Sequence, residues 1–98
     1  MPRIDVRLDE IPLGTLFRVE CDGSPIVLIR TSGGVSAFFD RCPHAHWPLS
    51  EGKLQDGLLQ CVGHGWQFDV RTGECLTVSE KISAYEVVIE DGFVKILI

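Results

Sequence analysis

The chain has 98 residues, of which 45% are hydrophobic and 23% charged, and its formal net charge is −5. This length suits one domain with a single core. The acidic balance argues against nucleic acid and anionic membranes as partners, because binding to either needs clustered Lys and Arg. The N-terminus mixes charges of both signs, and the longest apolar run, residues 26–29, is far short of a membrane span. We therefore expect no signal peptide, no membrane segment and a cytoplasmic protein.

Strand signals dominate the first forty residues. Short runs of apolar and β-branched side chains alternate with stretches that are rich in turn-forming residues, at residues 21–25 and 31–34. The run at 26–30 is apolar nearly throughout, which indicates a strand that is buried on both faces. Strands joined by tight turns predict a meander of antiparallel hairpins. The predicted strands cover residues 4–8, 14–19, 26–30 and 35–39.

Residues 41–74 break this strand rhythm. The segment is rich in Cys, His, Gly, Pro and Trp, and it holds all three histidines of the chain. Loops on a rigid β scaffold often carry function. We interpret the segment as a small insertion between strands.

The C-terminal part returns to strands. Apolar residues alternate from Tyr85 to Ile89, residues 90–92 (EDG) supply a turn, and residues 93–98 read as the last strand. No segment of useful length has a helical period. The whole pattern predicts an all-β fold of stacked sheets or a small, partly open barrel.

The middle segment contains two short motifs, Cys42-Pro43-His44 and Cys61-Val62-Gly63-His64, separated by sixteen residues. Each offers one thiolate and one imidazole, a combination that suits zinc or an iron–sulfur cluster. Three interpretations compete. The residues could be unliganded, although two matched pairs rarely arise by chance. A structural zinc site usually pairs Cys with Cys and His with His. A 2Fe–2S cluster with two Cys on one iron and two His on the other accommodates the C-x-H spacing best.

Two segments resemble the cluster loops of Rieske proteins: CPHAHWPLSEG at residues 42–52, and CVGHGWQFD followed by RTGE at residues 61–69 and 71–74. In length and strand order the whole chain resembles Rieske-type 2Fe–2S ferredoxins, the small carriers of bacterial ring-hydroxylating oxygenase systems. The resemblance implies that Cys42 and Cys61 bind the inner iron and His44 and His64 the outer iron of one cluster per chain.

The resemblance also implies the Rieske fold, with stacked antiparallel sheets and an inserted cluster-binding subdomain. We expect a single domain over residues 1–98, with a basal β region at 1–40 and 73–98 and the cluster subdomain at about 41–72. The implied function is that of a one-electron carrier, not an enzyme, between a flavin-containing, NAD(P)H-dependent reductase and a terminal oxygenase of aromatic hydrocarbon catabolism. We expect a monomer that forms transient complexes.

Two departures from high-potential Rieske proteins suggest a low reduction potential. The positions of their additional disulfide are Trp47 and Gly63 here, and the positions of their Ser and Tyr donors to sulfur are Trp66 and Phe68. Hydrogen bonds to the sulfurs raise the potential, so their loss predicts the low end of the Rieske range, roughly −150 mV.

Two alternative functions remain open at this point: a Rieske-like small subunit of a larger redox enzyme such as nitrite reductase, and a zinc-stabilised binding module. We expect His46 to be a solvent-facing loop residue and Cys21 and Cys75 to be free thiols. Trp47 and Trp66 could shield the cluster, form a docking face or simply pack against the cluster subdomain. Most acidic residues are expected on solvated strand edges and turns.

Overall fold

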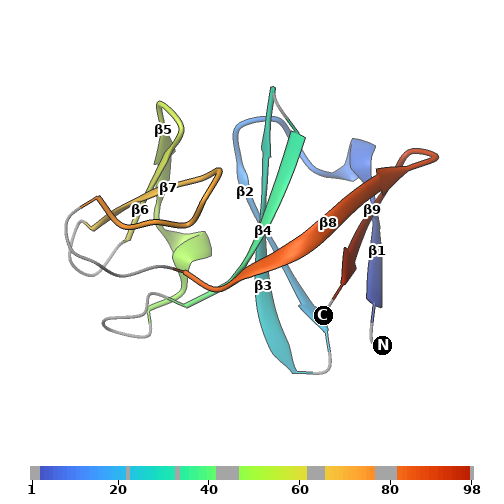
Figure 1. The fold of residues 1–98 in the computed structure, drawn as a ribbon, viewed down its shortest axis with the longest axis horizontal. Coiled ribbons are helices and arrows are strands. Elements are labelled where there is room, and N and C mark those ends of the chain that lie inside the picture. The colour runs from blue at the N-terminus through green and yellow to red at the C-terminus, as the bar shows by residue number, and fades with distance from the viewer. Residues whose placement is uncertain are drawn as a thin grey trace.

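The structure, a computed structural model, describes residues 3–21, 23–32, 34–41, 47–61, 66–76 and 82–97. These residues form two antiparallel sheets, and Figure 1 shows the smaller sheet at one end of the long axis and the N- and C-termini toward the other. The large sheet has the strand order β1-β9-β8-β4-β3-β2 and the small sheet the order β5-β6-β7. The strands are β1 (Arg3–Arg7), β2 (Leu16–Cys21), β3 (Ser24–Thr31), β4 (Gly34–Phe39), β5 (Lys53–Gln55), β6 (Leu58–Gln60), β7 (Gln67–Asp69), β8 (Ala84–Glu90) and β9 (Phe93–Leu97).

The hairpins of the large sheet confirm the predicted meander. In each hairpin, only two residues lie between the last paired residues of the two strands. The turn that was expected over residues 21–25 is therefore shorter than predicted. At the last of the hairpins, both central residues adopt positive φ, +54° at Asp91 and +78° at Gly92, as two-residue hairpin turns of this kind require. The closing pairs are Cys21 with Ser24, Thr31 with Gly34 and Glu90 with Phe93.

Strand β3 is buried on both faces, as its apolar run predicts. Because side chains alternate along a strand, Val27 and Ile29 face one side of the sheet while Ile26 and Leu28 face the other. The first pair joins a hydrophobic cluster between the two sheets, which we call the upper core. The second pair joins a cluster within the large sheet, which we call the basal core. The upper core contains Val27, Ile29, Phe38, Leu49, Leu59, Cys61, Phe68, Val70 and Ile82. The basal core contains Val6, Ile11, Ile26, Leu28, Ala37, Val94 and Ile96.

The small sheet was not predicted as strands. Its three members have three residues each and carry mostly polar or exposed side chains, so no alternating run is long enough to be read from the sequence. Their inward-facing residues, Leu59 and Phe68, are fully buried and lie opposite each other in the β6–β7 ladder. The inserted segment is therefore a sheet with its own contribution to the upper core. The division of the chain into a basal region and a cluster subdomain stays an interpretation.

Gly73 connects the end of the small sheet to the large one. Its N–H donates to the Asp69 carbonyl at 2.7 Å, and its own carbonyl accepts from the Ile82 N–H at 2.9 Å. It has a φ of +82°, and a Cβ atom there would lie 3.0 Å from both the Phe38 ring and the Ile82 carbonyl. Glycine is required here by both conformation and space.

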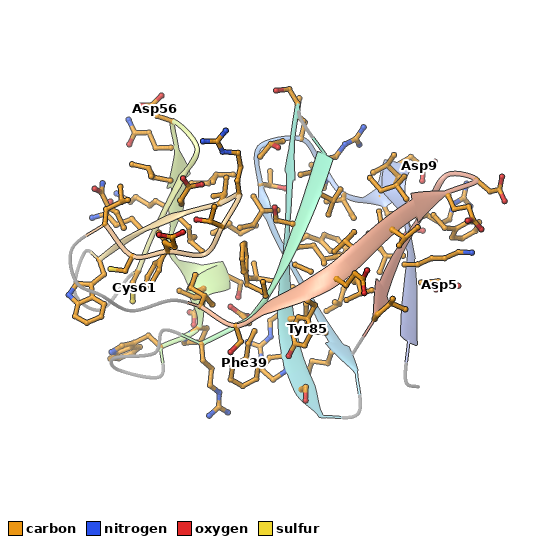
Figure 2. All side chains as sticks on the ribbon, in the orientation of Figure 1. Asp5, Asp9, Phe39, Asp56, Cys61 and Tyr85 are labelled. Atoms are coloured by element: carbon orange, nitrogen blue, oxygen red, sulfur yellow. The ribbon has the colours of Figure 1, made fainter. Side chains whose placement is uncertain are left out.

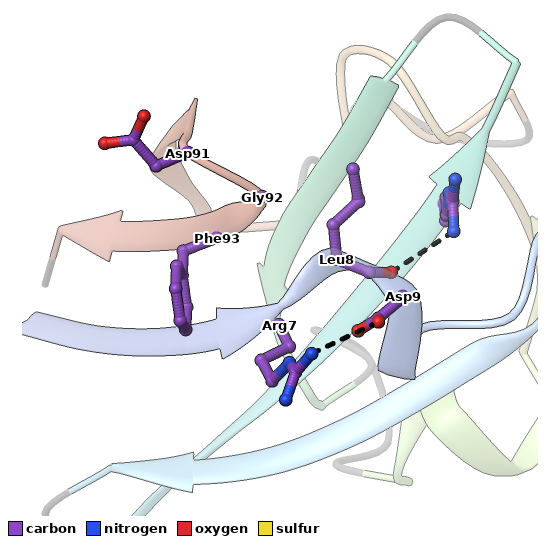
Figure 3. A pocket seen from close by; sticks show the side chains of 7 residues that line it. Arg7, Leu8, Asp9, Asp91, Gly92 and Phe93 are labelled. Carbon is purple, nitrogen blue, oxygen red and sulfur yellow. Dashed lines mark hydrogen bonds and ion pairs between the residues drawn. The ribbon is translucent and has the colours of Figure 1, made fainter.

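The end of the large sheet near the β8–β9 turn is held together by Arg30. Its guanidinium donates to the carbonyls of Leu8 and Ile11, at 3.2 and 3.1 Å, which fixes the short 3₁₀ helix η1 (Leu8–Glu10) onto β3. A cavity of about 320 Å³ opens beside it, and Figure 3 shows Arg7, Asp9, Asp91 and Phe93 around it. No helix in the described part of the chain is long and apolar enough to cross a membrane.

Candidate metal centre

Of the four predicted ligands, the structure describes Cys61 alone. Cys42, His44 and His64 lie outside the described residues, as does His46. Within the described ranges no group of three or more His, Cys, Asp or Glu side chains could hold a metal. The complete ligand set therefore stays a prediction. The described residues show how the chain is held at the positions that flank the two motifs.

Cys61 follows β6 directly and is only 1% exposed. It belongs to the upper core, together with Leu59 and Phe68 (Figure 2 labels Cys61). Its N–H donates to the Trp66 carbonyl at 2.8 Å, which closes the second motif at its base. A thiol that is surrounded by apolar side chains at the base of a short loop suits a sulfur ligand whose site must be shielded from water.

The first motif is closed at its base by Asp40 and Ser50. The Ser50 N–H donates to one carboxylate oxygen of Asp40 and the Ser50 hydroxyl to the other, both at 2.6 Å. The Asp40 N–H in turn donates to the Pro25 carbonyl on β3 at 2.9 Å. The nine residues between Asp40 and Ser50, which include Cys42 and His44, thus start and end at one fixed point on the large sheet.

The two closed bases lie side by side. Leu49, in the 3₁₀ helix η2 (Leu49–Glu51), shares the upper core with Cys61. Next to this helix, Gly52 approaches the backbone of Gln60 so closely that a Cβ atom would collide with the Gln60 carbonyl oxygen and lie 3.1 Å from its carbon. Since Gln60 immediately precedes Cys61, this contact fixes η2 and Gly52 against the start of the second motif. Two adjacent loops, each able to supply one sulfur and one nitrogen, fit a cluster with two Cys and two His ligands.

The aromatic residues of the two segments that resemble cluster loops, residues 42–52 and 61–69, differ in burial. Phe68 is fully buried in the upper core, and Trp66 is half-buried against it. Trp47 is 50% exposed. Packing is therefore the role that the structure supports for Trp66, whereas Trp47 presents much of its ring to solvent. The low reduction potential that was expected from the missing hydroxyl of Phe68 stays a prediction.

Cys75 is half-buried against the upper core and pairs with Phe68 through an isolated β-bridge. The state of its thiol, and that of Cys21, stays a prediction. The acidic side chains behave as expected, since Asp5, Asp9, Glu86 and Asp91 are exposed.

The sequence did not reveal the roles of Asp40, Ser50 and Gly52, although Ser50 and Gly52 belong to the segment at residues 42–52 that resembles a cluster loop. An acidic residue two positions before a predicted ligand, and a Ser-Glu-Gly turn after it, are common loop features. Their importance arises from contacts between residues eight to ten positions apart, which no local pattern reveals.

Residues 3–87 match the model of the Rieske [2Fe-2S] domain family. The chain is 36% identical over 74 residues to the anthranilate 1,2-dioxygenase ferredoxin subunit of Burkholderia cepacia, which covers 74% of this chain and 68% of that protein. It is 41% identical over 61 residues to the biphenyl 2,3-dioxygenase ferredoxin component of Rhodococcus jostii. This match covers 62% of this chain and 57% of the relative, so the chain spans just over half of the relative's length.

Solved structures are similar over nearly the whole chain. The ferredoxin of carbazole 1,9a-dioxygenase from Nocardioides aromaticivorans IC177 has a TM-score of 0.88 and 26% identity, over 98% of this chain and 97% of that one. A ferredoxin in complex with the oxygenase of carbazole 1,9a-dioxygenase has a TM-score of 0.87 and 28% identity, over 96% and 91% of the two chains.

A third solved structure, described provisionally as the small subunit of an NADPH nitrite reductase, has a TM-score of 0.87 over the full length of both chains. Its identity is 20%, so it shows the fold alone. The family match, the all-β fold and the two closed loop bases all point to the same family. The chain belongs to the Rieske [2Fe-2S] domain family, whose cofactor is a Rieske-type 2Fe–2S cluster.

Proposed function

We propose that this protein is a ferredoxin, a one-electron carrier whose cluster is held by Cys42, His44, Cys61 and His64. The observation that carries the proposal is the correspondence with the carbazole dioxygenase ferredoxin over 98% of this chain and 97% of that chain. When bound, a Rieske 2Fe–2S cluster takes up and releases single electrons. The protein is then a component of an oxygenase system and not itself an enzyme.

The described residues support such a role because they anchor the bases of both predicted ligand loops. Cys61 is anchored in the upper core and the Asp40 N–H donates to β3, so both loop bases rest on buried parts of the fold. A carrier benefits from ligands that move little between its two redox states, because less reorganisation accompanies each transfer. Phe68 and Leu59 are fully buried beside Cys61, which is itself only 1% exposed to solvent.

The partners that we propose are a flavin-containing reductase, which supplies the electron from NAD(P)H, and the terminal oxygenase of an aromatic-ring hydroxylating system. Support for the second comes from the similar ferredoxin that was solved in complex with an oxygenase. The exposed Trp47 lies in the segment at residues 42–52 that resembles the first cluster loop, and Trp is favoured at the centres of interfaces. We further propose a monomer that meets its partners transiently, in the cytoplasm.

The test of the cofactor proposal is an EPR spectrum of the dithionite-reduced protein, together with analysis of iron, sulfide and zinc. We expect matched iron and sulfide and a rhombic signal of the low average g that mixed Cys and His ligation produces. Cys61→Ser should lose the signal, while Cys75→Ser, a change of the same kind at the edge of the same core, should retain it. Zinc without iron, in protein produced with ample iron, would establish the binding-module alternative instead.

The carrier role needs a separate test, because a cluster alone does not show transfer. Reduced protein is mixed in a stopped-flow instrument with a purified ring-hydroxylating oxygenase component, and reoxidation is followed by visible absorbance. We expect rapid, concentration-dependent reoxidation that Cys61→Ser protein cannot support. Stable co-purification with a large catalytic subunit, and no transfer to an oxygenase, would favour the small-subunit alternative.

A further inference from the structure

Asp40 is the one buried charged side chain among the described residues, with 1% exposure. Its carboxylate receives two short hydrogen bonds from Ser50 and lies 3.6 Å from the Nε atom of Arg18, which is 44% exposed on β2. Burying a carboxylate is costly even when it is paired, and a neutral side chain could accept the same backbone hydrogen bond. The negative charge therefore needs an explanation beyond closing a loop.

The position of Asp40 supplies one. It stands two residues before Cys42 in the sequence, and two residues of chain span at most about 7 Å. The side chains of the two residues add to this Cα separation, and at about 12 Å, with an effective dielectric constant of about 20, a unit charge alters an equilibrium about tenfold. A negative charge opposes the arrival of an electron and so favours the oxidised state.

We propose that Asp40 is a positioning residue of the metal centre, which closes the first ligand loop through Ser50 and keeps the reduction potential low through its buried charge. This inference rests on the proposed ligand set. The proposal predicts one effect on loop closure and one on the reduction potential, and substitutions at different residues distinguish them. Ser50 contributes to loop closure alone, whereas Asp40 contributes to both closure and potential. Arg18 partly neutralises the carboxylate and should act on the potential with the opposite sign.

The test of the charge uses Asp40→Asn in the holoprotein, with Asp69→Asn as the matched control. Asp69 is also a carboxylate of the inserted segment that accepts a backbone hydrogen bond, from Arg71 at 2.8 Å, but it pairs with Leu58 at the end of the β6–β7 ladder opposite to Cys61. We expect a redox titration to shift about tenfold toward reduction in Asp40→Asn, which is about 59 mV for one electron. Asp69→Asn should shift far less. Equal shifts in the two variants would overturn the electrostatic role.

Arg18→Gln gives the sign test. Removing the cation should lower the midpoint potential, while Arg7→Gln, at the far end of the large sheet and paired with Asp9 at 3.5 Å, should leave it unchanged. A rise in potential in Arg18→Gln would contradict the proposal. This variant replaces a half-exposed side chain, so it also keeps the proposal testable if Asp40→Asn fails to fold.

Loop closure is tested by the rate at which the cluster is lost to a chelator, followed by bleaching of the visible absorbance. Ser50→Ala should lose the cluster about tenfold faster, and Ser50→Thr, which restores a hydroxyl, should return toward the native rate. Native kinetics in Ser50→Ala would refute the closing role. The proposed function and this inference can fail separately. Wild-type protein without iron and sulfide would contradict both. Wild-type protein with a full cluster, together with a native potential in Asp40→Asn and a native rate of cluster loss in Ser50→Ala, would contradict this inference alone.

Discussion

Gly52 illustrates how a single residue without a side chain positions the site. Its φ of −80° is open to any amino acid, so backbone conformation does not demand glycine there. Space does, because the Gln60 carbonyl occupies the place that a Cβ atom would take. The approach brings η2 against the residue that precedes Cys61, and the two loop bases keep their spacing through this contact.

We expect Gly52→Ala to destabilise the protein by about 2 kcal/mol, because the backbone of Gln60 has to move away. The same movement displaces Cys61, so the variant should also incorporate less iron and sulfide per chain. Gly57→Ala is the control: its φ of +76° costs about 1 kcal/mol, but no atom lies within 4 Å of the new methyl group. Urea unfolding and iron analysis of both variants check this. Full iron content in Gly52→Ala would mean that the close approach does not position Cys61.

A second residue-scale prediction concerns Phe68. A hydroxyl at the corresponding position donates to sulfur in the high-potential relatives, and Phe68 packs in the same core as Cys61. Phe68→Tyr should therefore raise the midpoint potential, by on the order of tenfold in the reduction equilibrium, or about 59 mV. Phe17→Tyr adds the same hydroxyl against the basal core and should not alter the potential. An unchanged titration in Phe68→Tyr would show that its ring edge does not reach the sulfur.

At the scale of elements, β3 separates the two cores, and its alternation allows a matched comparison. Ile29 belongs to the upper core with Cys61, and Ile26 belongs to the basal core; both are fully buried. Each Ile→Val change removes one methylene and should cost about 1 kcal/mol in unfolding free energy. Only Ile29→Val should broaden or shift the EPR signal of the reduced protein. The two cores would not be mechanically separate if Ile26→Val gave the same spectral change.

The elements also show which parts of the fold a sequence can reveal. The strands of the large sheet were predictable because a run of four or more alternating or continuous apolar side chains suffices to mark a strand, as at Ile26 to Ile29. The strands of the small sheet were not, since three residues carry too little pattern. For the site, the motifs around Cys42 and Cys61 were evident from their spacing. The contacts of Asp40 with Ser50 were not, because they depend on how the chain returns to itself.

At the scale of the whole molecule, the two cores depend differently on the cofactor. The upper core includes Cys61 and rests partly on the small sheet, whose three strands have only three residues each. The basal core draws on β1, β3, β4 and β9 and contains no predicted ligand. A cluster held by the four predicted ligands would connect the two loops, and binding to the native state alone would add to stability.

We therefore expect loss of the cluster to loosen the small sheet while the large sheet persists. In native-state hydrogen exchange, Cys61→Ser protein should lose amide protection in β6 and β7, where the ladder pairs Leu59 with Phe68. Protection in the β1–β9 ladder, such as the pair Val6 and Val94, should change little. Cys75→Ser serves again as the control, because it alters a thiol at the edge of the upper core outside the two motifs. Uniform loss of protection in both sheets would show one cooperative unit, because the large sheet would then need the cluster as much as the small one does.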